Sequence, residues 1–135
     1  MSLAPMRDVV ANLATSADGN TIPSIVFTKG GGAWLTEIAS IGAAAVGLDW
    51  TIDIGAARRS VGDRVALQGN LDPIVLLTDP ATVAREATKI LHAAGPAPGH
   101  VFNLGHGIVP GTPPANIAAL VETVHGVSRE TRAGP

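Results

Sequence analysis

The sequence has no cysteine and no tyrosine, and aromatic residues make up only 3% of it. Without cysteine, the chain cannot form a disulfide, a thiolate nucleophile or a zinc site with sulfur ligands. Charged residues make up 15%, the formal net charge is −2, and no run of Lys or Arg marks a nucleic-acid or anionic-membrane surface. No apolar run approaches about eighteen residues, and the first residues lack the pattern of a signal peptide. We therefore expect a soluble protein that binds neither nucleic acid nor a membrane.

Apolar residues are plentiful, at 46% of 135 residues, and the mean hydropathy is +0.31. This composition is too apolar for a disordered chain, and the length suits one domain with its own core. The hydropathy also indicates apolar surface that another element or chain covers. No linker or repeat divides the sequence, so we expect a single unit over residues 1–135.

Short apolar segments alternate with segments of helical spacing. A short amphipathic helix at the N-terminus is expected to end before Asp18. Four strand and helix pairs follow: strands over 22–27, 43–48, 64–67 and 101–104, and helices over 33–41, 53–61, 80–94 and from about 113 onward. Asp79 and Pro80 give the clearest helix start, and the polar tail over 129–135 is expected to fray. Uniformly apolar strands between helices predict a parallel sheet covered on both faces.

Two architectures fit this order of elements. One is an open, doubly wound sheet, which stands alone at this length. The other is half of a (β/α)₈ barrel, whose usual size is about 250 residues. A half barrel leaves two sheet edges and much apolar surface uncovered, so it requires the other half, a second copy or a partner. Counting strands does not choose between them.

Each predicted strand ends in polar or glycine-rich residues: Lys29-Gly30-Gly31, Asp49-Trp50-Thr51, Gln68-Gly69-Asn70 and Gly105-His106-Gly107. The carboxyl ends of parallel strands lie on the same side of a sheet, where α/β enzymes build their sites. We therefore expect one cleft to gather the side chains of Lys29, Asp49, Gln68, Asn70, Asn103 and His106.

Several of these groups have both a functional and a structural interpretation. Gly30 and the two glycines after it could present N–H groups to an anion, or form a turn that needs positive φ, and the turn is favoured. Asp49 could act as an acid or base or fix a neighbouring loop, or it could cap the turn that follows it. Asn70 and Asp72 are expected to bond to their own backbone.

His106 is the main candidate for function, because glycines on both sides leave no neighbouring side chain for it to pack against. An imidazole can donate, accept or meet a carboxylate near neutral pH. His92 and His125 fall on predicted helices, and His100 lies at the opposite end of its strand from the cleft. None of them is spaced for metal binding, and no Gly-x-Ser-x-Gly elbow exists, so we expect neither a metal site nor Ser/His/Asp catalysis.

Four motifs together point to a family: Phe27-Thr28-Lys29-Gly30-Gly31-Gly32, Val46-Gly47-Leu48-Asp49-Trp50-Thr51, Ala66-Leu67-Gln68-Gly69-Asn70-Leu71-Asp72-Pro73 and Phe102-Asn103-Leu104-Gly105-His106-Gly107-Ile108. In order and spacing they resemble the C-terminal portion of the uroporphyrinogen decarboxylase family. The likeness extends through Thr112-Pro113-Pro114 to Ser128, and the first helix is similar to the family's helix ahead of the first of these strands.

The resemblance implies the C-terminal half of a (β/α)₈ TIM barrel, which removes the open-sheet alternative. It also implies a cytoplasmic, cofactor-free carboxy-lyase of haem biosynthesis that acts as a homodimer. Such an enzyme converts the four acetate side chains of uroporphyrinogen III to methyl groups and so gives coproporphyrinogen III. The His of the family's Gly-His-Gly motif contacts the substrate, and the resemblance gives that role to His106.

The family's catalytic aspartate, its arginine loop and its substrate-contacting Tyr belong to the first half of the barrel and have no counterpart here. We therefore assign no catalytic residue, and we expect this chain to act as a fragment that is inactive by itself. It should associate with a second copy or with the missing N-terminal half. The alternative is a non-catalytic half barrel that serves as a binding or assembly module. Related methyl-transfer proteins use thiolate-assisted zinc, which the absence of cysteine argues against.

Overall fold

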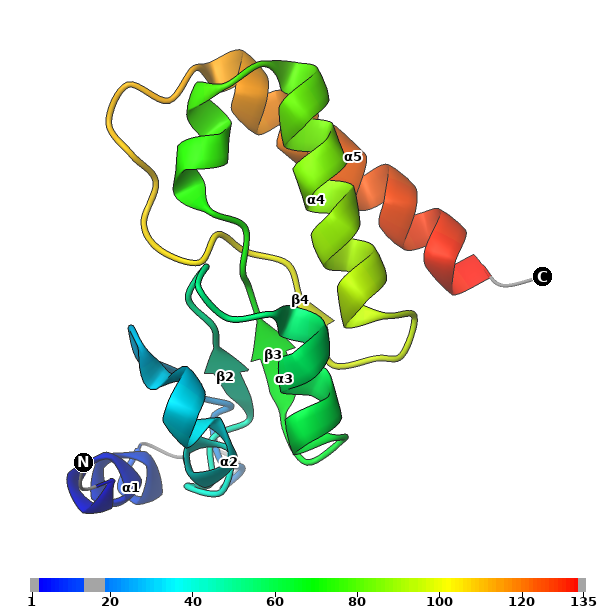
Figure 1. Ribbon diagram of the computed structural model, residues 1–135. Coiled ribbons are helices and arrows are strands. Elements are labelled where there is room, and N and C mark those ends of the chain that lie inside the picture. The colour runs from blue at the N-terminus through cyan, green and yellow to red at the C-terminus, as the bar shows by residue number, and fades with distance from the viewer. Residues whose placement is uncertain (1–2, 14–18, 134–135) are drawn as a thin grey trace.

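The computed structural model describes residues 3–13 and 19–133, which build a four-stranded parallel sheet with helices (Figure 1). The strands are β1 (Ile25–Phe27), β2 (Ala45–Gly47), β3 (Ala66–Gln68) and β4 (His100–Val101). They lie in the order of the chain, β1-β2-β3-β4, and every neighbouring pair is parallel. A bridge between Leu71 and Leu104 continues the pairing of β3 with β4 beyond the strands. The predicted parallel α/β sheet is confirmed.

Five α-helices and two short 3₁₀ helices lie between and around the strands of the described ranges. They are α1 (Ala4–Ala11), η1 (Gly31–Trp34), α2 (Leu35–Ile38), α3 (Ile54–Val61), η2 (Pro73–Leu77), α4 (Pro80–Ala94) and α5 (Pro114–Ala133). None of these helices is long and apolar enough to cross a bilayer.

Local capping explains the two best-defined helices. The Asp53 carboxylate accepts a hydrogen bond from the Ala56 N–H and opens α3, which ends at Gly62. Asp79 accepts from the Thr82 N–H and opens α4, which ends at Gly95 with φ of +81°. Both helices therefore begin and end as the sequence predicts.

The helices cover one face of the sheet. Val46 and Leu67 point to this face and are almost fully buried against apolar side chains of α2 and α3. Ile25, Phe27 and Val101 point to the opposite face and are 51%, 46% and 46% exposed. Strands in sequential order joined by right-handed crossovers place every connecting helix on the same side. The expectation that helices cover both faces is therefore wrong for the described residues.

A second apolar cluster joins α4, α5 and η2, and consists of Leu71, Leu76, Val83, Ala87 and Leu120. The Asn116 amide on α5 donates to the carbonyl oxygens of Leu76 and Thr78, at 2.9 and 2.7 Å, and so ties α5 to the end of η2. In Figure 1, α5 lies alongside α4.

Several predicted segments differ from the structure. The first strand covers only Ile25–Phe27, and the fourth, predicted over 101–104, covers His100–Val101. The helix expected over 33–41 is a 3₁₀ turn followed by the single turn of α2. The tail expected to fray from residue 129 is helical as far as Ala133, where the Thr131 hydroxyl donates to the Val127 carbonyl oxygen. The predicted end of the first helix falls on 14–18, outside the described residues, as do the last two residues of the tail.

Candidate functional site

The segments that follow the four strands meet around Asp49, which is 1% exposed. Its Oδ2 accepts the Gly30 N–H at 2.5 Å, which joins it to the segment after β1. Its Oδ1 accepts the Thr51 N–H at 2.8 Å and the Thr51 hydroxyl at 2.5 Å. Asp49 therefore caps its own turn and also fixes a neighbouring loop, and both of these interpretations are confirmed.

These contacts also set the charge state of Asp49. Burial by itself raises the pKa of the carboxyl group, but the hydrogen bonds from Thr51 and Gly30 and the positive charge of Lys29 lower it by more. The pKa of Asp49 therefore lies below the ordinary carboxyl value, and the group is a carboxylate at neutral pH.

Asn70 links the segment after β3 to the same loop. Its amide donates to the carbonyl oxygens of Asp49 and Ile52, at 2.8 and 2.6 Å, and the residue is buried. The expectation that Asn70 bonds to its own backbone is therefore wrong. Asp72 does bond locally as expected, because its carboxylate accepts the Ile74 N–H and begins η2.

Gly105 brings in the segment after β4 by a close backbone approach. A Cβ atom at this position would lie 2.3 Å from the Trp50 nitrogen, so only glycine fits there. A Cβ atom at Gly107 would have no neighbouring atom within 4 Å, and the φ of Gly107 is not positive. The two glycines around His106 thus differ: the first is fixed by packing and the second is not.

His106 is exposed and lies between two aromatic rings. Its ring centroid is 5.8 Å from that of Trp50 and 6.3 Å from that of Phe27, both edge-on. The imidazole lines an open cavity of about 510 Å³, together with Phe27, Gln68, Asn103, Leu104, Gly107 and Ile108. Of the six side chains expected in one cleft, Gln68, Asn103 and His106 line this cavity, and Lys29, Asp49 and Asn70 do not. What the sequence did not reveal is that aromatic side chains from two other strand ends orient the imidazole.

Lys29, in the segment after β1, approaches the Trp50 ring. Its ammonium lies 5.3 Å from the ring centroid of Trp50, within the range of a cation–π interaction. The next residue, Gly30, has φ of +71°, which confirms the interpretation of this glycine run as a turn with positive φ. The Gly30 N–H is already donated to Asp49, so it is not free for an anion.

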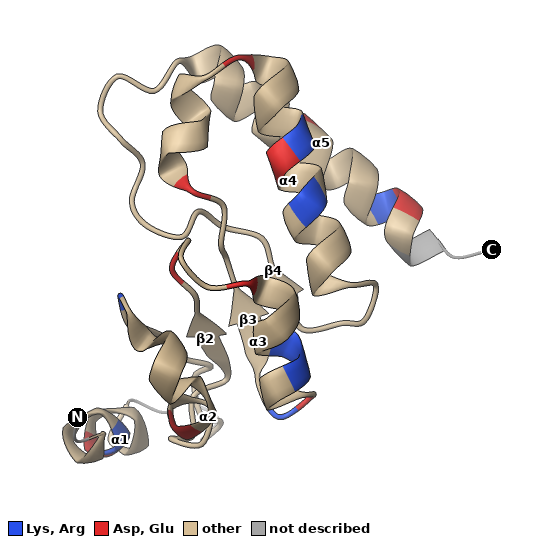
Figure 2. Cartoon of the chain, in the orientation of Figure 1, with Lys and Arg blue, Asp and Glu red and all other residues tan. Residues whose placement is uncertain are grey.

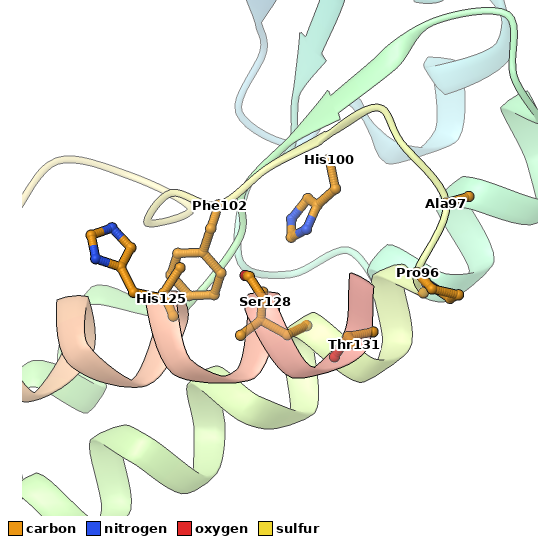
Figure 3. A pocket seen from close by; sticks show the side chains of 10 residues that line it. Pro96, Ala97, His100, Phe102, His125, Ser128 and Thr131 are labelled. Atoms are coloured by element: carbon orange, nitrogen blue, oxygen red, sulfur yellow. The ribbon is translucent and has the colours of Figure 1, made fainter. Parts of the chain in front are cut away.

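A separate, smaller cavity of about 250 Å³ lies between β4 and α5. Figure 3 shows His100 and Phe102 on one side of it, and His125, Ser128 and Thr131 on the other. The His100 Nε2 lies 2.8 Å from the Gly69 carbonyl oxygen. Within residues 3–13 and 19–133, no three His, Asp or Glu side chains are grouped closely enough to hold a metal ion.

Comparison with known proteins decides the family. The family model for uroporphyrinogen decarboxylase (URO-D) matches residues 1–127. The chain belongs to the uroporphyrinogen decarboxylase family. The resemblance inferred from the four motifs is thereby confirmed, and the matched residues include every strand-end segment described above.

Curated uroporphyrinogen decarboxylases are similar over almost the whole chain. The proteins of Aromatoleum aromaticum and Dechloromonas aromatica are 62% and 64% identical over 133 and 132 residues. These matches cover 98% and 97% of this chain but 37% of each relative. The chain therefore spans little more than a third of the length of these family members.

A solved structure shows the same fold at lower identity. A methyltransferase from Methanosarcina mazei superposes with a TM-score of 0.69 and 22% identity. The superposition covers 82% of this chain and 33% of the methyltransferase. At this identity the likeness concerns the arrangement of strands and helices alone.

Proposed function

We propose that this chain forms the C-terminal part of a uroporphyrinogen decarboxylase. The whole enzyme removes carbon dioxide from the four acetate side chains of uroporphyrinogen III and gives coproporphyrinogen III. The observation that carries the proposal is that the family match covers all four strand-end motifs, and the fold brings these motifs to one edge of the sheet.

In this proposal His106 is a substrate-contacting residue. Its imidazole is exposed in the 510 Å³ cavity, and two aromatic rings hold it from the side. An imidazole can donate a hydrogen bond to a substrate carboxylate or accept one from a pyrrole N–H. The proposed reaction uses no cofactor.

The architecture we propose is the C-terminal half of a (β/α)₈ barrel. Sequential parallel strands with all helices on one face form an arc of such a barrel, and the exposed Ile25, Phe27 and Val101 then face its interior. The barrel is completed by the N-terminal half of the same family or by a second copy. We also propose that the protein works in the cytoplasm, where this biosynthesis uses soluble intermediates.

The reaction requires a carboxylate near the pyrrole nitrogens, where it stabilises positive charge on the ring. The carboxylates of the strand-end segments are Asp49, Asp53, Asp72 and Asp79, and each accepts a backbone N–H of its own loop or of a neighbouring one. None of them corresponds to the family's catalytic aspartate, which belongs to the first half of the barrel, so we propose that the chain alone has no decarboxylase activity.

A chimera tests the proposal. The segment of the Aromatoleum aromaticum enzyme that aligns with this chain is replaced by this chain, and coproporphyrinogen formation is measured beside the chain alone. We expect turnover by the chimera, none by the isolated chain, and at least about tenfold lower kcat/KM for a His106→Gln chimera. A folded chimera without activity would favour the alternative, a non-catalytic binding module, and turnover by the isolated chain would contradict its proposed inactivity.

A further inference from the structure

One lysine is placed where the strands end. The segments after the strands, residues 28–30, 48–53, 69–79 and 102–113, contain no Lys or Arg other than Lys29. Figure 2 shows most Lys and Arg residues on the helices α3, α4 and α5 instead. An anion that approaches this edge of the sheet therefore meets a single permanent positive charge from this chain.

Lys29 takes part in none of the ion pairs of the described residues, although its charge acts on the buried Asp49 carboxylate nearby. Asp53, Asp72 and Asp79 cap helices, and Asp49 is bonded to Gly30 and Thr51. Within the described parts of the chain, the ion pairs are those that Glu86 makes with two cations on α4. The Lys29 side chain is exposed, so its ammonium is accessible to a ligand.

The ammonium and the His106 imidazole both contact one indole. Lys29 lies over the Trp50 ring at 5.3 Å, and His106 meets that ring edge-on at 5.8 Å. The backbone on both sides is fixed, because Asp49 bonds to Gly30 and precedes Trp50 in the chain. A permanent cation and a hydrogen-bonding imidazole thus contact one indole, and the imidazole lines the cleft.

We propose that Lys29 is a second substrate-contacting residue, which binds a carboxylate of the substrate beside His106. This inference rests on the proposed function, because a substrate with acetate and propionate side chains presents several carboxylates at once. A cation stacked on an indole suits such a group, since the ring fixes the lysine stem while the ammonium keeps its donors. Lys29 recognises substrate and has no part in breaking the carbon–carbon bond.

Binding by the chimera with the Aromatoleum aromaticum enzyme tests the inference. The chimera is titrated with uroporphyrin, the stable oxidised form of the substrate ring system, and tryptophan fluorescence reports binding. Uroporphyrin octamethyl ester, which has the same ring and no negative charge, is the control ligand. Lys29→Gln is compared with the control Lys89→Gln on α4, whose side chain pairs with Glu86. Far-UV circular dichroism checks that each variant is folded.

We expect Lys29→Gln to weaken uroporphyrin binding about tenfold, the scale of a hydrogen bond between charged groups. Lys29→Arg should restore most of the affinity, and Lys89→Gln should leave it unchanged. Binding by the unsubstituted chimera should weaken with added salt, and the dependence should be shallower for Lys29→Gln.

Two results would overturn the inference in distinguishable ways. If Lys29→Gln binds uroporphyrin like the unsubstituted chimera while His106→Gln does not, the assignment of Lys29 is wrong and the proposed function stands. If the unsubstituted chimera binds no porphyrin, or binds the ester as tightly as the acid, carboxylate recognition at this edge is wrong and the proposed substrate contact of His106 falls with it.

Discussion

Replacing Asp49 with Asn should destabilise the chain by about 2–4 kcal/mol. An amide has nearly the same shape, but its NH₂ group cannot accept the hydrogen bonds that one carboxylate oxygen accepts. If the NH₂ group of the new amide faces Gly30, the Gly30 N–H loses its acceptor. If the NH₂ group faces Thr51 instead, the Thr51 N–H loses its acceptor. Each is a bond to a charged group worth about 1.5–3 kcal/mol, and the remaining bond loses its charge. Asp49→Asn also removes the cost of burying a charge, but this gain offsets little of the lost stability. The hydrogen bonds already outweigh burial in setting the pKa of Asp49.

The destabilisation caused by Asp49→Asn should also depend on pH. The pKa of Asp49 in the folded chain lies below 3.8, its ordinary value. The carboxylate therefore stabilises the fold at neutral pH, and this contribution disappears as the pH falls through the folded pKa. The difference in unfolding free energy between wild type and Asp49→Asn should be complete above about pH 5 and shrink below it.

Urea unfolding, followed by far-UV circular dichroism at several pH values, measures both effects. Asp53→Asn is the matched control, because Asp53 caps α3 from an exposed position and Asn caps a helix as well as Asp does. We expect the control to change stability by less than about 0.5 kcal/mol. The reasoning would be refuted if the two variants were equally stable, or if the Asp49→Asn difference persisted undiminished in acid.

Three further predictions concern the site and the sheet. Gly105→Ala should cost at least about 2 kcal/mol, because its Cβ meets backbone, whereas Gly107→Ala should change urea stability by less than about 0.5; equal effects would contradict the packing argument. Asn70→Ala should cost about 1–3 kcal/mol, because two buried carbonyl oxygens lose their donor, and an unchanged urea midpoint would contradict this. Ile25→Lys, on the open sheet face, should lower the mass measured by light scattering, and Val9→Lys on α1 should not. A wild-type chain that is monomeric at moderate concentration would contradict the last prediction.

The helices were predictable where their signals are local. Helix α3 begins at the cap Asp53 and ends at Gly62, and α4 begins at the cap Asp79 and ends at Gly95. These caps act on N–H and C=O groups within a few residues. The sequence predicted the strands, but it did not predict that side chains on one face of the sheet are exposed. Ile25 is as apolar as a buried strand residue, and only the order of the strands decides that its side of the sheet has no helix.

The sequence predicted that the strand ends meet at one site. It did not predict the hydrogen bonds that connect the strand-end segments to one another. Asp49 is bonded to an N–H 19 residues away, and Asn70 to carbonyl oxygens 21 and 18 residues away. Nothing in the local sequence marks such pairs, because side chains of both types also bond to their own backbone. Gly105 could equally have been a hinge, since its close neighbour, Trp50, is distant in sequence.

The sequential order of the strands also sets the order in which the site can assemble. A ribosome delivers the chain from its N-terminus, at about 5–20 residues per second. Asp49 can bond to Gly30 as soon as β2 has emerged, and Asn70 can join them next. The approach of Gly105 to Trp50 must wait for the last strand. His106, the residue on which the proposed function depends most, therefore belongs to the last segment of the site to be synthesised.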